Sequence, residues 1–369
     1  MIDLRLAIKG LYLAVRNAAL SLCIRPRKAA HPDPGKVQKI LAVRLDRIGD
    51  MVVSEPALRT LHELFPRARL TVLTRPETLP LLRAVPWIDE VLVYGGFFKT
   101  AAGLRRQRFS LAIDLLMDYT LKTALLVRLS NAAVTAGFDI AGRGRVFSIA
   151  VKPAQPGLKM YQHTLELVRQ IAAQFGIRGP TGDRQPHLIL CEDQKRFKDD
   201  FYRKNSLEGR MCIGIHPGAK FPSQRWQPEK FVELGDRICA AGAKVILIAS
   251  RPEQALAEGI SAAMKSKPVV SIGLPLDKTV ALISGMRIFV CNNSGPLHIA
   301  AALGVSTVST MGPTDPVLWA PAGEKAVVIR RELSCSPCNR AVCAVHECLG
   351  SITVSELWQA VQGQLARAK

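Results

Sequence analysis

The sequence lacks the loops that mark three common classes of nucleotide-dependent enzyme. It has no Gly-x4-Gly-Lys-Ser/Thr loop, no Asp-x-Asp pair, and no Gly-x-Gly-x2-Gly at its first strand. These absences argue against a P-loop kinase, a transferase that clamps its donor through a metal, and a dinucleotide-dependent redox enzyme. Aromatic residues make up only 6% of the chain and no stretch interleaves them with basic residues, so stacking platforms for nucleic acid are not expected.

Acidic residues are also scarce, with 30 Asp and Glu against 50 Lys and Arg and a formal net charge of +20. That excess predicts an anionic partner, such as nucleic acid, a membrane surface or a phosphorylated substrate; the alternative is a solvated basic surface. A length of 369 residues allows two domains, and 48% hydrophobic residues support real cores. The longest uncharged stretch, residues 288–314, holds two asparagines, a histidine and two prolines, which favours buried core over a membrane span.

The first 25 residues show helical spacing of apolar residues, at positions 4, 8, 11, 15, 18 and 22. Arg5, Lys9 and Arg16 fall on one stripe of the same helix and split any signal-peptide core, and Pro26 ends the segment. An amphipathic basic helix of this kind is typical of a membrane interface. The other interpretation is a helix packed on the protein itself or on a partner subunit, because apolar residues also flank the stripe on its other side.

Short apolar strands alternate with helices along the rest of the chain, which predicts an α/β protein with doubly wound parallel sheets. The expected strands are residues 40–43, 70–73, 91–94, 111–114, 212–216, 245–249, 269–272, 288–291 and 305–310. A stretch rich in glycine and proline, residues 176–186, separates two halves of this pattern. We therefore expect four segments: a helix and linker (1–36), two Rossmann-like domains (37–185 and 186–352) and a docking helix (353–369).

The first polar loop that follows a strand runs from Arg44 to Asp50. A carboxylate at such a strand end can take a proton from an attacking hydroxyl, which makes Asp50 a candidate general base. Chemistry alone favours a simpler role for Asp50, as a helix cap or as the partner of Arg44 or Arg47. The two arginines add positive charge where an anionic acceptor or its phosphate would bind.

The second loop follows residues 288–290 and opens a helix with the run Asn-Asn-Ser-Gly-Pro-Leu-His, residues 292–298. Exposed N–H groups at a helix N-terminus attract phosphate oxygens. Gly295 permits close approach of the backbone, Ser294 can donate its hydroxyl, and His298 lies one turn inward. A buried core histidine is the alternative for His298.

Cations stand beyond another strand end, where Lys220 and Arg225 follow the strand at 212–216. A diphosphate needs a cation where no metal is guaranteed, and arginine offers a bidentate fork, so Arg225 is the first candidate and Lys220 the second. The alternative is an ordinary surface charge. A third loop, residues 312–316, follows the strand at 305–310 and is expected close to the same site.

Four cysteines cluster near the C-terminus, at Cys335, Cys338, Cys343 and Cys348, with His346 among them. Tetrahedral zinc takes four thiolates, or three thiolates and an imidazole, so a structural zinc site is one interpretation. The spacing is not that of a standard zinc ribbon, and buried or simply reduced thiols are the other interpretation. The remaining five cysteines are scattered and are expected in cores.

Together these motifs resemble glycosyltransferase family 9, the heptosyltransferases of lipopolysaccharide core synthesis, from about residue 39 to the C-terminal helix. The resemblance rests on residues 40–52, 56–59, 216–220, 225–226, 292–303 and 312–315 and on the cysteine cluster. It implies a GT-B fold, in which an acceptor-side domain and a donor-binding domain, both Rossmann-like, face a cleft. The leading helix lies outside this family core.

The family resemblance further implies inverting transfer of a heptose from ADP-heptose to a lipid-linked glycan acceptor of the lipopolysaccharide core, with no cofactor required. Such an enzyme would be cytoplasmic and peripheral on the inner membrane, without a nucleic-acid partner. The catalytic aspartate of the family falls on Asp50, which overturns the cap assignment. The donor-binding positions implied by the resemblance are Lys220, Arg225, Glu253, Asn293, Ser294, Gly295 and His298.

Two positions depart from the pattern of the family. Asn293 stands where the family loop commonly has aspartate, which removes a carboxylate and bears on donor identity. Gln224 stands where a lysine often precedes the Arg-Trp pair, so Arg225 or Lys220 must take its role. Two other functions stay open: a GT-B-type enzyme acting on a different nucleotide sugar, such as an epimerase, and a basic nucleic-acid-binding protein without catalysis.

Overall fold

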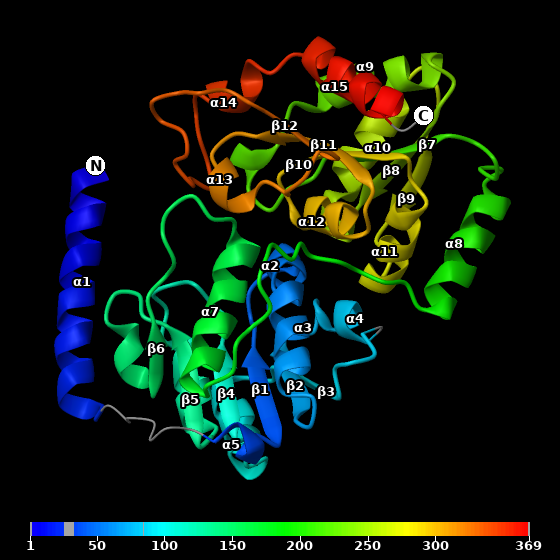
Figure 1. The fold of residues 1–369 in the computed structure, drawn as a ribbon. Coiled ribbons are helices and arrows are strands. Elements are labelled where there is room, and N and C mark those ends of the chain that lie inside the picture. Colours follow the sequence, from blue (N-terminus) through cyan, green and yellow to red (C-terminus); the bar gives the residue numbers. More distant parts are fainter. Residues whose placement is uncertain (1, 26–32, 84, 368–369) are drawn as a thin grey trace. The chain divides into compact units, whose positions relative to one another are not determined.

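The computed structural model describes residues 2–25, 33–83 and 85–367, without the side chains of residues 2–7 and 9. Residues 26–32, which include Pro26 and part of the predicted linker, lie outside this description. The chain divides into two units, Met1–Arg184 and Gln185–Lys369. Each unit has its own parallel sheet and its own helices (Figure 1), and each is described here by itself.

The first unit is built on a six-stranded parallel sheet with the strand order β3-β2-β1-β4-β5-β6. Its strands are β1 (Lys39–Val43), β2 (Arg69–Thr74), β3 (Glu90–Val93), β4 (Leu111–Asp114), β5 (Val134–Phe138) and β6 (Ile149–Val151). Its helices are α1 (Ile2–Cys23), α2 (Ile48–Val53), α3 (Glu55–Leu64), α4 (Leu79–Leu82), α5 (Phe97–Arg106), α6 (Lys122–Leu129) and α7 (Met160–Gln174), with 3-10 turns η1 (Pro34–Lys36) and η2 (Arg143–Val146).

The second unit has a six-stranded parallel sheet with the order β12-β11-β10-β7-β8-β9. Its strands are β7 (Cys212–His216), β8 (Lys244–Ala249), β9 (Val269–Ile272), β10 (Ile288–Asn292), β11 (Ser306–Met311) and β12 (Ala326–Arg330). Its helices are α8 (Glu192–Lys204), α9 (Pro228–Ala240), α10 (Gln254–Ala263), α11 (Leu276–Ser284), α12 (Gly295–Ala302), α13 (Pro316–Trp319), α14 (Glu347–Gly350) and α15 (Val354–Arg367), with 3-10 turns η3 (Pro222–Gln224) and η4 (Arg251–Glu253).

Both sheets follow the same winding, because the first and fourth strands of each unit lie side by side at its centre. In the first unit β1 pairs with β4, and in the second β7 pairs with β10. Successive strands run outward in opposite directions from these two pairs, which makes each pair a topological switch point. Ligands of open α/β sheets bind outside the carboxyl ends of strands at such points. The predicted α/β class with parallel sheets is confirmed.

Each sheet is buried by its own helices, as all-parallel sheets require. The core of the first unit includes Leu41, Leu73 and Leu126, all without exposed surface. In the second unit α15 closes the core, since Leu357 and Val361 are fully buried against α9 and the sheet. In the described part of the chain no helix is both long and apolar enough to cross a bilayer.

Candidate active site

The switch point of the first unit is occupied by a buried arginine. Arg44 directly follows β1, and its side chain is only 1% exposed. Its Nε forms an ion pair with Asp46 Oδ1 at 2.8 Å, its Nη2 contacts Asp50 Oδ1 at 3.2 Å, and its Nη1 donates to the carbonyl of Leu115. The fork of Arg44 therefore joins two carboxylates to the loop that follows β4.

Asp50 lies in the first turn of α2 and has a partner on each carboxylate oxygen. One oxygen accepts from Arg44, and the other accepts from the backbone N–H of Arg47 at 3.2 Å. The side chain of Asp50 nevertheless keeps 14% of its surface exposed. The structure thus contains both arrangements expected for this residue, a helix-start contact and an arginine partner, and it leaves the carboxylate accessible for proton transfer.

Further charged groups surround this switch point. Asp114 ends β4 beside Val43, and it forms a fully buried ion pair with Arg143 of η2. Arg143 also donates to the carbonyl of Asp118 at 2.7 Å, which holds the loop after β4. Desolvation and the neighbouring carboxylates of Asp50 and Asp114 outweigh the attraction of Arg44 and raise the pKa of Asp46 to about 7. Asp46 therefore changes its charge near neutral pH.

The switch point of the second unit is organised by a buried asparagine. Asn292 ends β10 and has no exposed surface. Its Oδ1 accepts from the backbone N–H of Trp226 and from the hydroxyl of Thr310, both at 2.9 Å, and its Nδ2 donates to the carbonyl of Pro217 at 2.7 Å. One side chain thereby joins the loop after β7 to the ends of β10 and β11. Sequence reasoning missed this role, although a polar residue ending an apolar strand was a usable signal.

A chain of polar side chains crosses the same edge of the sheet. Ser294, the residue before α12, lies with its Oγ 3.5 Å from Nδ1 of His216 at the end of β7. The other ring nitrogen, Nε2, lies 3.4 Å from Oε2 of Glu253 in η4. Although burial raises the pKa of Glu253, hydrogen bonds from His216 and Ser250 lower it to about 2. His216 thus connects the candidate phosphate-binding turn to a permanently charged carboxylate.

Glu253 approaches the loop after β7 so closely that only glycine fits there. A Cβ built on Gly218 would lie 1.9 Å from Glu253 Oε1. Since real Cβ atoms do not come that near, any side chain at position 218 would displace Glu253 from His216. The glycine of this loop is therefore explained by the packing of the candidate site itself.

The remaining donor-side candidates lie on the same loops. Arg225 follows η3 and donates through Nε to the carbonyl of Ala219 at 2.9 Å, while Lys220 is exposed with its ammonium over the ring of Phe221. Asn293 donates its backbone N–H to Thr310, and His298 is buried in α12 with its ring edge toward Trp319. All of them belong to loops or a helix start at the carboxyl edge of the second sheet.

The cysteine segment, residues 335–348, packs against two of these loops. Its His346 ring contacts the carbonyl of Ser223 at 2.9 Å, and its Ser336 hydroxyl donates to Gly312 at 2.6 Å. All four cysteines are free thiols, and burial together with the other three raises the pKa of Cys348. Within the described residues no three His, Cys, Asp or Glu side chains are grouped so that they could hold a metal ion.

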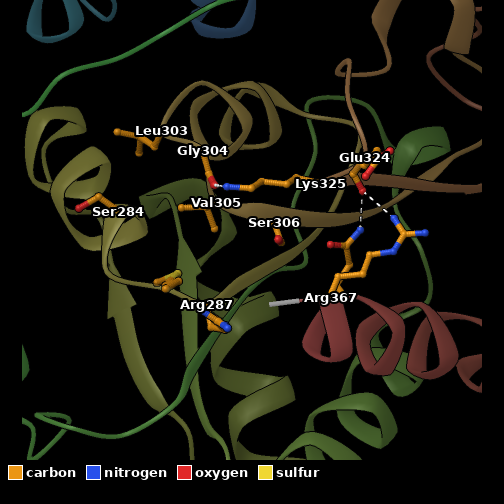
Figure 2. Close-up of a pocket in the computed structure, with 11 residues that line it drawn as sticks. Ser284, Arg287, Leu303, Gly304, Val305, Ser306, Glu324, Lys325 and Arg367 are labelled. Carbon is orange, nitrogen blue, oxygen red and sulfur yellow. Dashed lines mark hydrogen bonds between the residues drawn. The ribbon is translucent and has the colours of Figure 1, made fainter. Parts of the chain in front are cut away.

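A cavity of about 440 Å³ lies at the opposite edge of the second sheet (Figure 2). Its lining includes Arg287 and Ser306, next to the starts of β10 and β11, and also Lys325, which donates to the carbonyl of Gly304 at 3.1 Å. The candidate donor loops follow the other ends of these strands. The cavity is therefore separate from the candidate active site.

Comparisons with known proteins agree with this architecture. The family model of "Glycosyltransferase family 9 (heptosyltransferase)" matches residues 97–349. Lipopolysaccharide heptosyltransferase 2 of Escherichia coli (strain K12) is 28% identical over 313 residues, which cover 79% of this chain and 88% of that protein. Lipopolysaccharide heptosyltransferase 1 of Pseudomonas aeruginosa is 25% identical over 322 residues, covering 83% and 87%.

Solved structures extend the likeness over both units. The structure of ADP-heptose lipopolysaccharide heptosyltransferase II from E. coli has a TM-score of 0.75 at 25% identity, covering 90% of this chain and 99% of that one. A family 9 glycosyl transferase from Veillonella parvula has a TM-score of 0.77 at 20% identity, covering 92% and 99%, and supports the fold.

The two Rossmann-type sheets and these likenesses define an enzyme of the GT-B glycosyltransferase class. More specifically, the chain belongs to glycosyltransferase family 9, the heptosyltransferase family.

Proposed function

We propose that the protein transfers a heptose from ADP-heptose to a lipid-linked acceptor of the lipopolysaccharide core, with inversion at the anomeric carbon. The observation that carries this proposal is the likeness to a heptosyltransferase structure over 90% of the chain, which includes strands of both units. In the reaction an acceptor hydroxyl attacks the anomeric carbon, the bond from that carbon to the diphosphate oxygen breaks, and the hydroxyl proton passes to a protein base.

Asp50 is the proposed base. Its pairing with Arg44 fixes the direction of the carboxylate, while its exposed part remains within reach of a hydroxyl. The sequence placed Arg44 beside Arg47 as an acceptor contact. Because the guanidinium of Arg44 is buried on Asp46, Asp50 and the Leu115 carbonyl, we now assign it to positioning Asp50. Arg47 is exposed and keeps its proposed role toward an acceptor phosphate.

The second unit is the proposed donor site. N–H groups at the start of α12 and the hydroxyl of Ser294 would bind the diphosphate, and Arg225 and Lys220 would supply the cations that stabilise it as it leaves. Glu253 would bind the ribose or adenine part. His216 contacts both Ser294 and Glu253. It would therefore hold the diphosphate-binding turn and the carboxylate for the ribose or adenine in fixed positions.

The reaction as proposed requires no cofactor. A structural zinc at the cysteine segment stays a prediction, and its place would be to brace the loops of Ser223 and Gly312 that the segment contacts. A lipid-linked acceptor places the reaction at the cytoplasmic face of the inner membrane, where we propose that the protein is peripheral.

A donor panel tests the proposal. Purified protein is mixed with ADP-heptose, UDP-sugars or GDP-sugars, and donor binding is measured by thermal shift. Release of nucleotide diphosphate is then measured with and without a lipopolysaccharide core acceptor. We expect a thermal shift with ADP-heptose and ADP release that depends on acceptor. Turnover of a UDP- or GDP-sugar instead would reject the proposed donor, and epimerisation without acceptor would reject transfer.

A further inference from the structure

The first helix presents an apolar face that the rest of the first unit does not cover. This α1 apolar face consists of side chains that are 56% to 86% exposed: Ile8, Leu11, Tyr12, Val15 and Leu22. At 3.6 residues per turn these positions fall within an arc of about 100° on one side of the helix. Single exposed apolar residues are ordinary, but five on one helix face form a continuous patch.

The opposite side of α1 fixes this orientation. Arg16 and Leu20 are each only 8% exposed. Arg16 donates to the carbonyls of Tyr119 and Ala141, and Asn17 lies against Gly142, so α1 is bound beside η2 (Figure 1). Because α1 packs on the first unit through Arg16 and Leu20, the α1 apolar face is directed away from that unit. The interpretation of α1 as a helix packed on the protein itself therefore applies to the side with Arg16 and Leu20, and the membrane interpretation stays a prediction for the other side.

The sequence around α1 is mostly basic, because residues 1–32 contain six Lys and Arg and one acid, Asp3. At the C-terminal end of α1, next to the exposed Leu22, Arg128 donates to the carbonyls of Arg25 and Val146, which places it with the exposed Arg25 and Arg145. The nearest acid of this loop, Asp139, accepts from the backbone N–H of Gly144. The patch is therefore apolar with a cationic border.

We propose that the α1 apolar face inserts into the headgroup region of an anionic lipid bilayer, with the basic residues around it on the lipid phosphates. An apolar helix face with flanking cations is the chemistry of an interfacial helix. A second copy of this chain is the other candidate occupant, but a symmetric contact would bring the same cationic border against itself. The inference rests on the proposed reaction at a membrane, and it identifies the α1 apolar face as the surface that contacts the bilayer.

The test uses the full chain and vesicles of phosphatidylethanolamine with anionic phosphatidylglycerol, and measures the bound fraction by cosedimentation. We expect the double variant Leu11→Asp, Val15→Asp to lower the vesicle partition at least about tenfold, because two apolar side chains can no longer be buried. The matched control is Val342→Asp, Val345→Asp, which changes two exposed valines of the second unit, 71% and 79% exposed. The control is expected to bind like the wild type.

Three further measurements make the result decisive. Unchanged circular dichroism and thermal midpoint show that the aspartates leave the fold intact; if they do not, Ile8→Ser, Leu22→Ser repeats the test. Light scattering reports the oligomeric state, and a wild-type dimer that the variant converts to a monomer would overturn the lipid assignment. Equal partition of wild type and variant would overturn it as well. ADP binding is measured in parallel, so a failure of the proposed reaction is seen independently of the vesicle result.

Discussion

The two units have the same strand order around their switch points, yet they fill those points with opposite chemistry. In the first unit two buried arginines, Arg44 after β1 and Arg143 of η2, pair with carboxylates. In the second unit the ends of β7 and β10 and the residue before α12 hold His216, Asn292 and Ser294 in a hydrogen-bond network with one carboxylate at its end. One winding therefore holds two different sets of side chains, which we propose serve proton transfer in the first unit and anion binding in the second.

Net charge also differs between the two units, and the first unit is the more basic. The first unit has 28 Lys and Arg against 14 Asp and Glu, and the second has 22 against 16. The unit proposed to receive the anionic, lipid-linked acceptor thus has +14 of the total +20, and the unit proposed to bind the nucleotide has +6. Long-range attraction of an acceptor surface needs many exposed charges, whereas a nucleotide is bound by a few aligned N–H groups and cations.

Among the variants that test the difference between the two units, Asp50→Asn is expected to have the largest effect, which is a loss of turnover. Loss of the base should lower kcat by about 10²- to 10⁴-fold, the usual contribution of general-base catalysis. Donor binding depends on the second unit and should be unchanged. Turnover is measured as ADP release with acceptor, and ADP affinity by calorimetry. Glu77→Gln, an exposed carboxylate of the same unit, is the control. If the Asp50→Asn variant keeps full activity, the assignment of Asp50 is wrong.

Asn292→Ala is the counterpart in the second unit and should act on structure as well as on binding. Truncation leaves the Trp226 N–H and the Pro217 carbonyl without their partner, which costs about 2–4 kcal/mol of unfolding free energy for two buried polar groups. We expect faster hydrogen exchange in β7 and β10, with β1 and β4 unaffected, and weaker ADP binding. Asn205→Ala, at the end of α8, is a control on an exposed asparagine. Equal loosening of both sheets would show that the units are not separate.

Most strands of the two sheets could be predicted from the sequence, because a short apolar run followed by a glycine-containing loop is a strong local signal for a strand. Nine of the strands were expected at nearly their observed positions, including β1, β4, β7 and β10. Three strands were missed, namely β5, β6 and β12. Their segments, such as Val134–Phe138 with its Gly137, have short or mixed patterns, and their pairing is decided by the neighbouring strand rather than by local propensity. The long helix α7 was missed as well.

The residues of the candidate site were predicted by type and position, but of their partners only the pairing of Asp50 with Arg44 or Arg47 was expected. Sequence reasoning assigned Arg44 to an anionic acceptor or to Asp50, and it did not predict the contact with the carbonyl of Leu115, which is 71 residues distant in the chain. In the same way, Asn292 and His216 gain their roles from loops that only the sheet brings together. Such contacts follow from tertiary structure: a polar residue at a strand end marks a position such as Asn292, but the sequence does not name its partners.

Zinc content distinguishes the two interpretations of the cysteine segment. If the cluster binds zinc, protein purified with the metal should contain about one zinc per chain by mass spectrometry of metals, and Cys338→Ser should lose it. Chelation should then lower the thermal midpoint and weaken ADP binding, because the segment contacts the loops of Ser223 and Gly312. Cys239→Ser, on α9, serves as the control. A chain without stoichiometric zinc would leave the cysteines as reduced thiols.

Stability is expected to respond to pH in opposite directions in the two units. The pKa of Asp46 is raised from 3.8 to about 7, so its contribution to folding is full below pH 3.8 and is lost as the pH rises through about 7. The pKa of Glu253 is lowered from 4.5 to about 2, so its contribution is present above pH 4.5 and is lost as the pH falls toward 2.

Two variants check these signs. Asp46→Asn should remove the loss of stability of the first unit between about pH 4 and pH 7, and Glu253→Gln should lower the stability of the second unit at about pH 7 while the difference from wild type vanishes near pH 2. Hydrogen exchange at several pH values assigns each change to its unit. A shift of both units in the same direction would show that one of the two carboxyls lacks the environment described, and the matching variant would identify which.

The smallest effect, a change in ADP affinity, is expected from Gln224→Lys. This variant introduces the lysine that the resemblance to family 9 leads us to expect at this position. Gln224 now donates to the hydroxyl of Thr314 at 3.0 Å, one residue before Arg225. A lysine there adds a cation to the proposed diphosphate site, so ADP affinity should rise several-fold and the gain should shrink with salt. Lys36→Gln and Gln38→Lys, exposed changes in the first unit, should leave ADP affinity unchanged. An unchanged affinity for Gln224→Lys would mean that Arg225 and Lys220 already saturate the diphosphate.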